Sequence, residues 1–132
     1  MIKGIRILLL ALFLCATSCR PDYVHMRAPS GGSVDVISLR EIQQAELDQL
    51  VPHSGLRSAL FLSYYERDLP NDTADHQLDD AVAIALVRAA QTADSVILVE
   101  RNIPILRGTG LVRGQRYAFR RLGTGRWRHL SL

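Results

Sequence analysis

Arginine is concentrated in the last quarter of the chain. From Arg101 to Leu132 there are eight arginines and no acidic residue, whereas Cys19 to Glu100 holds six arginines and thirteen acids. The guanidinium group is planar and always charged, and it binds carboxylates and phosphates through paired hydrogen bonds. This separation of basic from acidic residues along the chain predicts anionic partners for these arginines, either inside the chain or outside it.

Both origins of the anion are open at this point. In one interpretation the arginines pair with acids of the first two-thirds and protect exposed strand edges from aggregation. In the other they form a face that binds an external phosphate or carboxylate. The candidate binding residues are Arg116, Arg120, Arg121, Arg126 and Arg128.

The turn of the expected C-terminal hairpin decides which of these arginines face each other. A two-residue turn places Arg121 opposite Arg126, and a three-residue turn places Arg120 opposite Arg128. Like charges directly across a ladder are unfavourable by up to about 1 kcal/mol. Either register therefore leaves an arginine that gains from an anion.

A second candidate site is an acidic cluster at Asp72, Asp75, His76, Asp79 and Asp80. Carboxylates and imidazole are common ligands of zinc and calcium, but the spacing matches neither an EF-hand nor a His-Glu-x-x-His motif. Acids at the start of a helix are also expected, because they interact favourably with the helix dipole. We therefore predict no metal and no other cofactor, with a metal-dependent or enzymatic module using Asp72–Asp80 as the alternative.

The sequence shows no catalytic constellation. There is no Gly-x-Ser-x-Gly nucleophile elbow, and no cysteine follows Cys19. His25, His53 and His129 are isolated from any organised set of partners in the sequence. We predict no catalytic residues and a protein that is not an enzyme.

The N-terminus has the parts of an export signal. Lys3 and Arg6 precede an uninterrupted apolar stretch over residues 7–14, and small residues follow at 16–18. The stretch is too short for a membrane-spanning helix, which needs about 20 apolar residues. Residues 1–18 are therefore predicted to be a signal peptide.

This segment resembles a bacterial lipoprotein signal peptide. Thr17, Ser18 and Cys19 match the lipobox, whereas Ala16 replaces the usual leucine. The resemblance implies cleavage before Cys19, acylation of its thiol with palmitate or a similar chain, and a bacterial cell-envelope location. Arg20 is not the aspartate that retains lipoproteins at the inner membrane, so the outer membrane, facing the periplasm, is expected. Ordinary cleavage at the same bond, releasing a soluble periplasmic protein, is the alternative.

The predicted cell-envelope location limits the partners that the protein can meet. Beside the membrane that holds the lipid, we expect an anionic envelope polymer or an acidic envelope protein, and no nucleic acid. Lipopolysaccharide phosphates and peptidoglycan carboxylates are the anions that such a protein meets. The expected function is that of a small non-catalytic lipid-anchored protein that binds or supports another envelope component.

The remaining elements are expected to form one small domain over residues 35–132, joined to the lipid by a flexible tether over 19–34. The capping box Ser38-x-x-Glu41 predicts a helix over 38–51. Further expected elements are a strand over 59–65, a helix over 76–92, a strand over 95–99 and a hairpin formed by 111–122 and 126–132. The expected fold is α+β, with a mixed sheet of four or five strands and two helices on one face.

Overall fold

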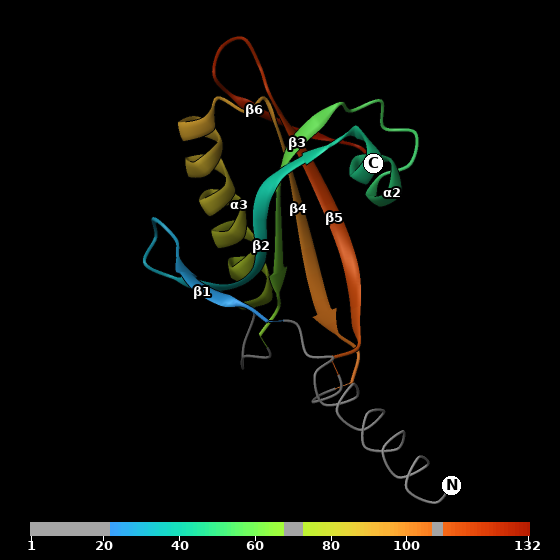
Figure 1. The fold of residues 1–132 in the computed structure, drawn as a ribbon. Coiled ribbons are helices and arrows are strands. Elements are labelled where there is room, and N and C mark those ends of the chain that lie inside the picture. The colour runs from blue at the N-terminus through green and yellow to red at the C-terminus, as the bar shows by residue number, and fades with distance from the viewer. Residues whose placement is uncertain (1–21, 68–72, 107–109) are drawn as a thin grey trace, which may run out of the picture.

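The computed structural model of the chain describes residues 22–67, 73–106 and 110–132, and Figure 1 shows its fold. The strands are β1 (Val24–Arg27), β2 (Ser33–Gln43), β3 (Ser58–Tyr65), β4 (Val96–Pro104), β5 (Val112–Arg121) and β6 (Trp127–Leu130). The helices are α2 (Gln44–Leu50) and α3 (Thr73–Thr92). No helix within these ranges combines the length and the apolar character needed to cross a bilayer.

The strands form a single mixed sheet in chain order. Strands β3 and β4 are parallel because α3 connects them and returns the chain to the same end, while every other neighbouring pair is antiparallel. The α+β class, the mixed sheet and the C-terminal hairpin are thus confirmed. The sheet has six strands, more than the four or five expected.

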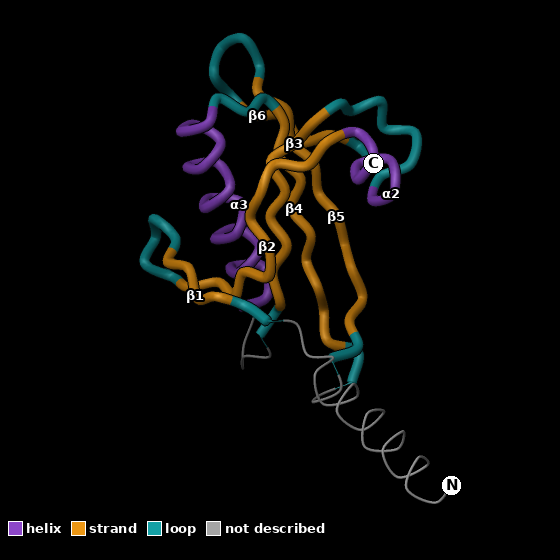
Figure 2. Tube along the Cα trace, in the orientation of Figure 1, coloured by secondary structure: helices purple, strands orange, loops and turns teal. Residues whose placement is uncertain are grey.

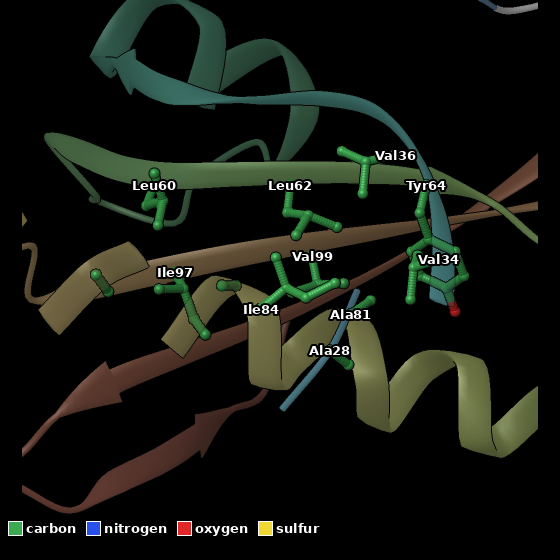
Figure 3. Packing of buried hydrophobic residues seen from close by; sticks show 12 residues of the cluster. Ala28, Val34, Val36, Leu60, Leu62, Tyr64, Ala81, Ile84, Ile97 and Val99 are labelled. Atoms are coloured by element: carbon green, nitrogen blue, oxygen red, sulfur yellow. The ribbon is translucent and has the colours of Figure 1, made fainter. Parts of the chain in front are cut away.

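The main core lies between one face of the sheet and α3. Leu62 and Tyr64 of β3 and Val99 of β4 pack there against Ala81 and Ile84 of the helix, as Figure 3 shows. Intervening residues of the same strands point to the other face, because side chains alternate along a strand. Apolar residues on both sides explain why β3 and β4 have almost continuous hydrophobic sequences.

A smaller core lies on the opposite face, beneath α2. Leu47 of the helix is fully buried against Ile42, Phe61 and Leu98. The prediction that both helices cover one face is therefore wrong, and Figures 1 and 2 show them on opposite sides of the sheet. The reason is that α2 follows β2 directly, at the end where Ile42 points away from α3.

The predicted helix over 38–51 is wrong in its first half. Ser38 and Glu41 lie in β2, opposite Ser63 and Leu60 of β3, so they form no capping box. The backbone groups of this stretch bond to β3 instead, and tertiary pairing outweighs the local helical pattern. The helix begins at Gln44. Arg40 and Glu46 tie it to β2 through two hydrogen bonds of 2.9 and 2.6 Å, and the bond from Arg40 lowers the pKa of Glu46 below its usual value.

The predicted flexible tether over 19–34 is wrong from Val24 onward. Val24–Arg27 forms β1, and the following glycines make the turn into β2. The amide of Ala28 donates to the carbonyl of Gly32 at 2.7 Å, and Gly31 has a φ of +94°, a conformation that glycine adopts without strain. A four-residue strand is too short to show a period, so its proline- and glycine-rich flanks suggested a linker.

Candidate anion-binding site

The C-terminal hairpin brings two arginines face to face. Arg120 of β5 lies directly opposite Arg128 of β6. The amide of Leu122 donates to the carbonyl of Arg126 at 2.7 Å, which closes a three-residue turn at 123–125. Of the two registers considered, the structure adopts the three-residue one. Like charges across the ladder oppose hairpin formation unless an anion lies between them.

Arg116 is exposed, but its guanidinium group is paired with an acid of the protein. It lies opposite Glu100 in the register of β4 and β5, and its Nε donates to Glu100 Oε2 at 2.9 Å. The other oxygen of Glu100 accepts from Ser63 Oγ at 3.0 Å, and Asn102 Nδ2 donates to that hydroxyl at 2.8 Å. These partners assign Arg116 to an internal network rather than to an external anion.

A second arginine of the final quarter is also paired internally. Arg101 bonds to Glu66 on the α3 face, with Nη2 2.6 Å and Nε 2.9 Å from Oε1. Burial alone lowers the pKa of Arg101, but the hydrogen bond and the charge of Glu66, with Tyr117 and Tyr64, outweigh it and raise the pKa above its usual value. Internal pairing with acids of the first two-thirds therefore accounts for Arg101 and Arg116.

Arg121 has an aromatic partner. Its guanidinium carbon lies 5.1 Å from the centre of the Trp127 ring, directly across the ladder. Trp127 in turn packs against the main core on the α3 face. A cation over an indole is stabilised by the ring's electron density. Arg121 therefore stabilises the hairpin, and its side chain lies on the other face of the sheet from that of Arg120.

Arg120, Arg126 and Arg128 form the remaining set, which we call the arginine patch. Alternation along the two strands puts Arg120 and Arg128 on the face that carries α2, Arg126 directly precedes β6, and all three are exposed. Within the described parts of the chain, no acidic side chain lies at ion-pair distance from any of them. The patch is thus the part of the predicted anion-binding set that the fold leaves available.

A groove of about 310 Å³ lies beside the arginine patch, and Arg120 contributes to its wall. The loop that follows α2 supplies the other side, where His53 has a φ of +63°, an uncommon conformation for a residue with a side chain. The lining combines apolar and polar groups from Val51, Pro52, His53, Ser54, Leu56, Arg120, Leu130, Ser131 and Leu132. Cationic, hydroxyl and imidazole groups in one concavity suit a carboxylate or phosphate attached to a partly apolar molecule.

The other predicted sites are placed as follows. His76 and Asp79 are exposed, and Asp80 accepts a hydrogen bond of 2.7 Å from Ser30 Oγ, which links the β1–β2 turn to α3. No three metal-type side chains come together within the described residues. Cys19, the predicted lipid site, and Asp72 lie outside these residues.

Sequence reasoning missed a charged cluster at the β1 edge. Asp35 of β2 is 2% exposed, and its Oδ1 lies 2.5 Å from Nδ1 of His25 across the strand pair. Arg67 Nε lies 3.8 Å from the other oxygen of Asp35, and Arg67 Nη2 donates to the carbonyl of Ser33 at 2.5 Å. The only sequence signal was an acid between two valines in an apolar stretch. The cluster links β1 to the sheet, because the buried carboxylate of Asp35 lies against His25 of β1 and near Arg67.

Comparisons of this chain with protein-family models, curated proteins and solved structures find no match. The functional conclusion therefore depends on the residues of the chain and their arrangement.

Proposed function

We propose that the protein is a small, non-catalytic lipoprotein of the bacterial cell envelope that binds carboxylates of peptidoglycan through the arginine patch and its groove. Acylated Cys19 is the anchor, and the folded domain carries the binding face. The observation that supports the binding most directly is that Arg120 and Arg128 face each other without a described acid beside either. A bound carboxylate would relieve their repulsion and accept hydrogen bonds from both.

The position of the patch favours peptidoglycan over lipid headgroups of the anchoring membrane. The chain enters the sheet at β1, and β1 and the β4–β5 turn lie at one end in Figure 1, while β6 and α2 lie at the other. Arg120 is eight residues along β5 from Val112, a distance of about 26 Å at the usual rise of a strand. A patch at that end faces away from the anchor and toward the space where the cell wall lies.

Co-sedimentation with purified peptidoglycan sacculi tests the proposal. We expect the full-length protein to sediment with sacculi at low salt and to be released as the ionic strength rises, because exposed charges are screened. The double variant Arg120→Gln/Arg128→Gln should bind about tenfold more weakly or less, since each charge-assisted hydrogen bond contributes more than 1 kcal/mol.

Arg113→Gln is the control for the loss of an arginine elsewhere on β5. Arg113 is exposed on β5, has no described acidic partner, and lies opposite Ile103 near the other end of the strand. Its loss removes a positive charge from the protein without touching the patch. Equal weakening by Arg113→Gln, or unchanged binding of the double variant, would contradict the proposed site. Intact mass analysis of protein extracted from membranes tests the anchor separately, since acylation adds the mass of the fatty acids to Cys19.

A further inference from the structure

Exposed apolar side chains gather at one end of the sheet. Ile105, Leu106 and Leu111, beside the turn between β4 and β5, are 66%, 58% and 59% exposed. At the start of β1, Tyr23 and Val24 are 47% and 68% exposed. We call these five residues the apolar end. Isolated apolar residues are normal on a surface, but a local group of them marks a contact with a partner or a membrane.

Register and ring contacts place the two parts of the apolar end near each other. The ring of Tyr23 stacks on that of Tyr65 with centroids 6.2 Å apart. Tyr65 lies opposite Asn102 of β4, two residues before Pro104, where the strand ends. Figure 1 shows the start of β1 and the β4–β5 turn at the same end of the molecule.

The proposed lipid must also lie at this end. Only three residues separate Cys19 from Tyr23 in the sequence. Even a fully extended chain spans at most about 14 Å between these two positions. Acyl chains on Cys19 would therefore enter the bilayer within that distance of the apolar end, whatever path the intervening residues take.

We infer that the apolar end inserts into the interface of the bilayer that holds the anchor, an inference that rests on the proposed acylation of Cys19. Apolar side chains held beside a bilayer leave water for the boundary between headgroups and acyl chains. Tyr23 has the amphipathic ring that is enriched at this depth. Arg113, exposed on β5 two residues after Leu111, is placed to reach lipid phosphates with its long side chain. The lipid and the apolar end then together orient the sheet with this end at the membrane and the arginine patch at the end farthest from it.

Site-specific quenching tests the inference on the full, membrane-extracted protein. Of the natural cysteines, Cys15 lies within the proposed signal peptide and is removed with it, and acylated Cys19, the residue after the signal, has no free thiol. Leu106→Cys and Leu122→Cys variants then each offer one site for an environment-sensitive dye. Leu122 is the matched control because it is also an exposed leucine, at the β5–β6 turn of the opposite end. Val87→Cys on α3, which is 48% exposed, is a second control.

The labelled proteins are reconstituted into phosphatidylethanolamine–phosphatidylglycerol vesicles that contain nitroxide-labelled lipid. We expect quenching at position 106 about threefold stronger than at 122 or 87, because an inserted side chain lies about 5–10 Å into the boundary. Circular dichroism confirms that each variant is folded. If the protein is acylated but quenching is equal at all three sites, the proposed insertion is wrong and the proposed acylation of Cys19 is unaffected. Protein that proves unacylated by mass would overturn the anchor and this inference together.

Discussion

Arg116 and Arg128 lie on the same face of the sheet, yet their surroundings give them opposite energetic roles. Arg116 neutralises Glu100, whose carboxylate also bonds to Ser63. Arg128 lies opposite another arginine. A charge that satisfies a partly buried acid stabilises the fold, whereas a charge that repels its neighbour across the ladder weakens the fold and attracts a ligand. The fold therefore uses the charge of Arg116 and leaves that of Arg128 available.

The two arginines should therefore respond differently to the same substitution. We expect Arg116→Gln to lower the free energy of unfolding by about 1–2 kcal/mol, because Glu100 loses a charge-assisted hydrogen bond. Arg128→Gln should raise the free energy of unfolding by up to about 0.5 kcal/mol, because a like-charge pair disappears. Urea denaturation at low salt measures both changes. A loss of stability in Arg128→Gln would mean that Arg128 has a stabilising partner in the protein.

The short helix α2 supports one wall of the groove beside the arginine patch. It contacts the sheet through one fully buried side chain, Leu47, and leads directly into the loop that lines the groove. A seven-residue helix has little stability of its own. The wall of the groove therefore depends on the packing of this helix against β2 and β3.

Leu47→Ala should separate this role from general destabilisation. The substitution removes buried atoms and leaves a cavity, which costs about 2–4 kcal/mol of stability, and we expect binding to sacculi to weaken because the groove wall loses its support. Leu86→Ala is the control, since Leu86 packs against the main core on the other face. It should lower stability without changing binding at a temperature where both variants are folded. Equal binding by the two variants would show that α2 does not shape the site.

Over the whole molecule, burial decreases from the centre of the sheet to its edges. Strands β3 and β4 have core residues on both faces, under α3 on one side and near α2 on the other. Strands β1 and β6 have one neighbour each and four residues apiece. Opening an edge strand exposes little apolar surface, whereas opening β3 or β4 disrupts both cores.

Amide hydrogen exchange should follow this order. We expect the amides of Leu60–Tyr64 and Val96–Val99 to exchange slowest and close to the rate of global unfolding. Amides of β1 and β6 should exchange fastest among the strands, with β2 and β5 between. Exchange read by mass spectrometry or NMR checks the order. If β1 is as protected as β3, the contacts of Asp35 with His25 and Arg67 hold that edge more firmly than its position suggests.

The sequence alone was sufficient for the elements that carry a strong local pattern. Apolar residues on both faces predicted β3 and the first part of β4, apolar residues at helical spacing predicted most of α3, and the Gly-Thr-Gly turn predicted the C-terminal hairpin. The arginine excess of the last quarter was also evident from composition. These features depend on the residues themselves or on near neighbours in the chain.

Only the tertiary structure decided which arginines are available and what surrounds them. Arg116 and Arg101 are neutralised by Glu100 and Glu66, whereas Arg120, which lies opposite Arg128, lines a groove to which the loop after α2 contributes. Long-range pairing likewise turned Ser38–Gln43 into strand and brought β1 into the sheet. In each case the deciding partner is distant in sequence. Hydrogen bonds, burial and charge act through space, and a local sequence pattern does not identify a partner that is distant in the chain.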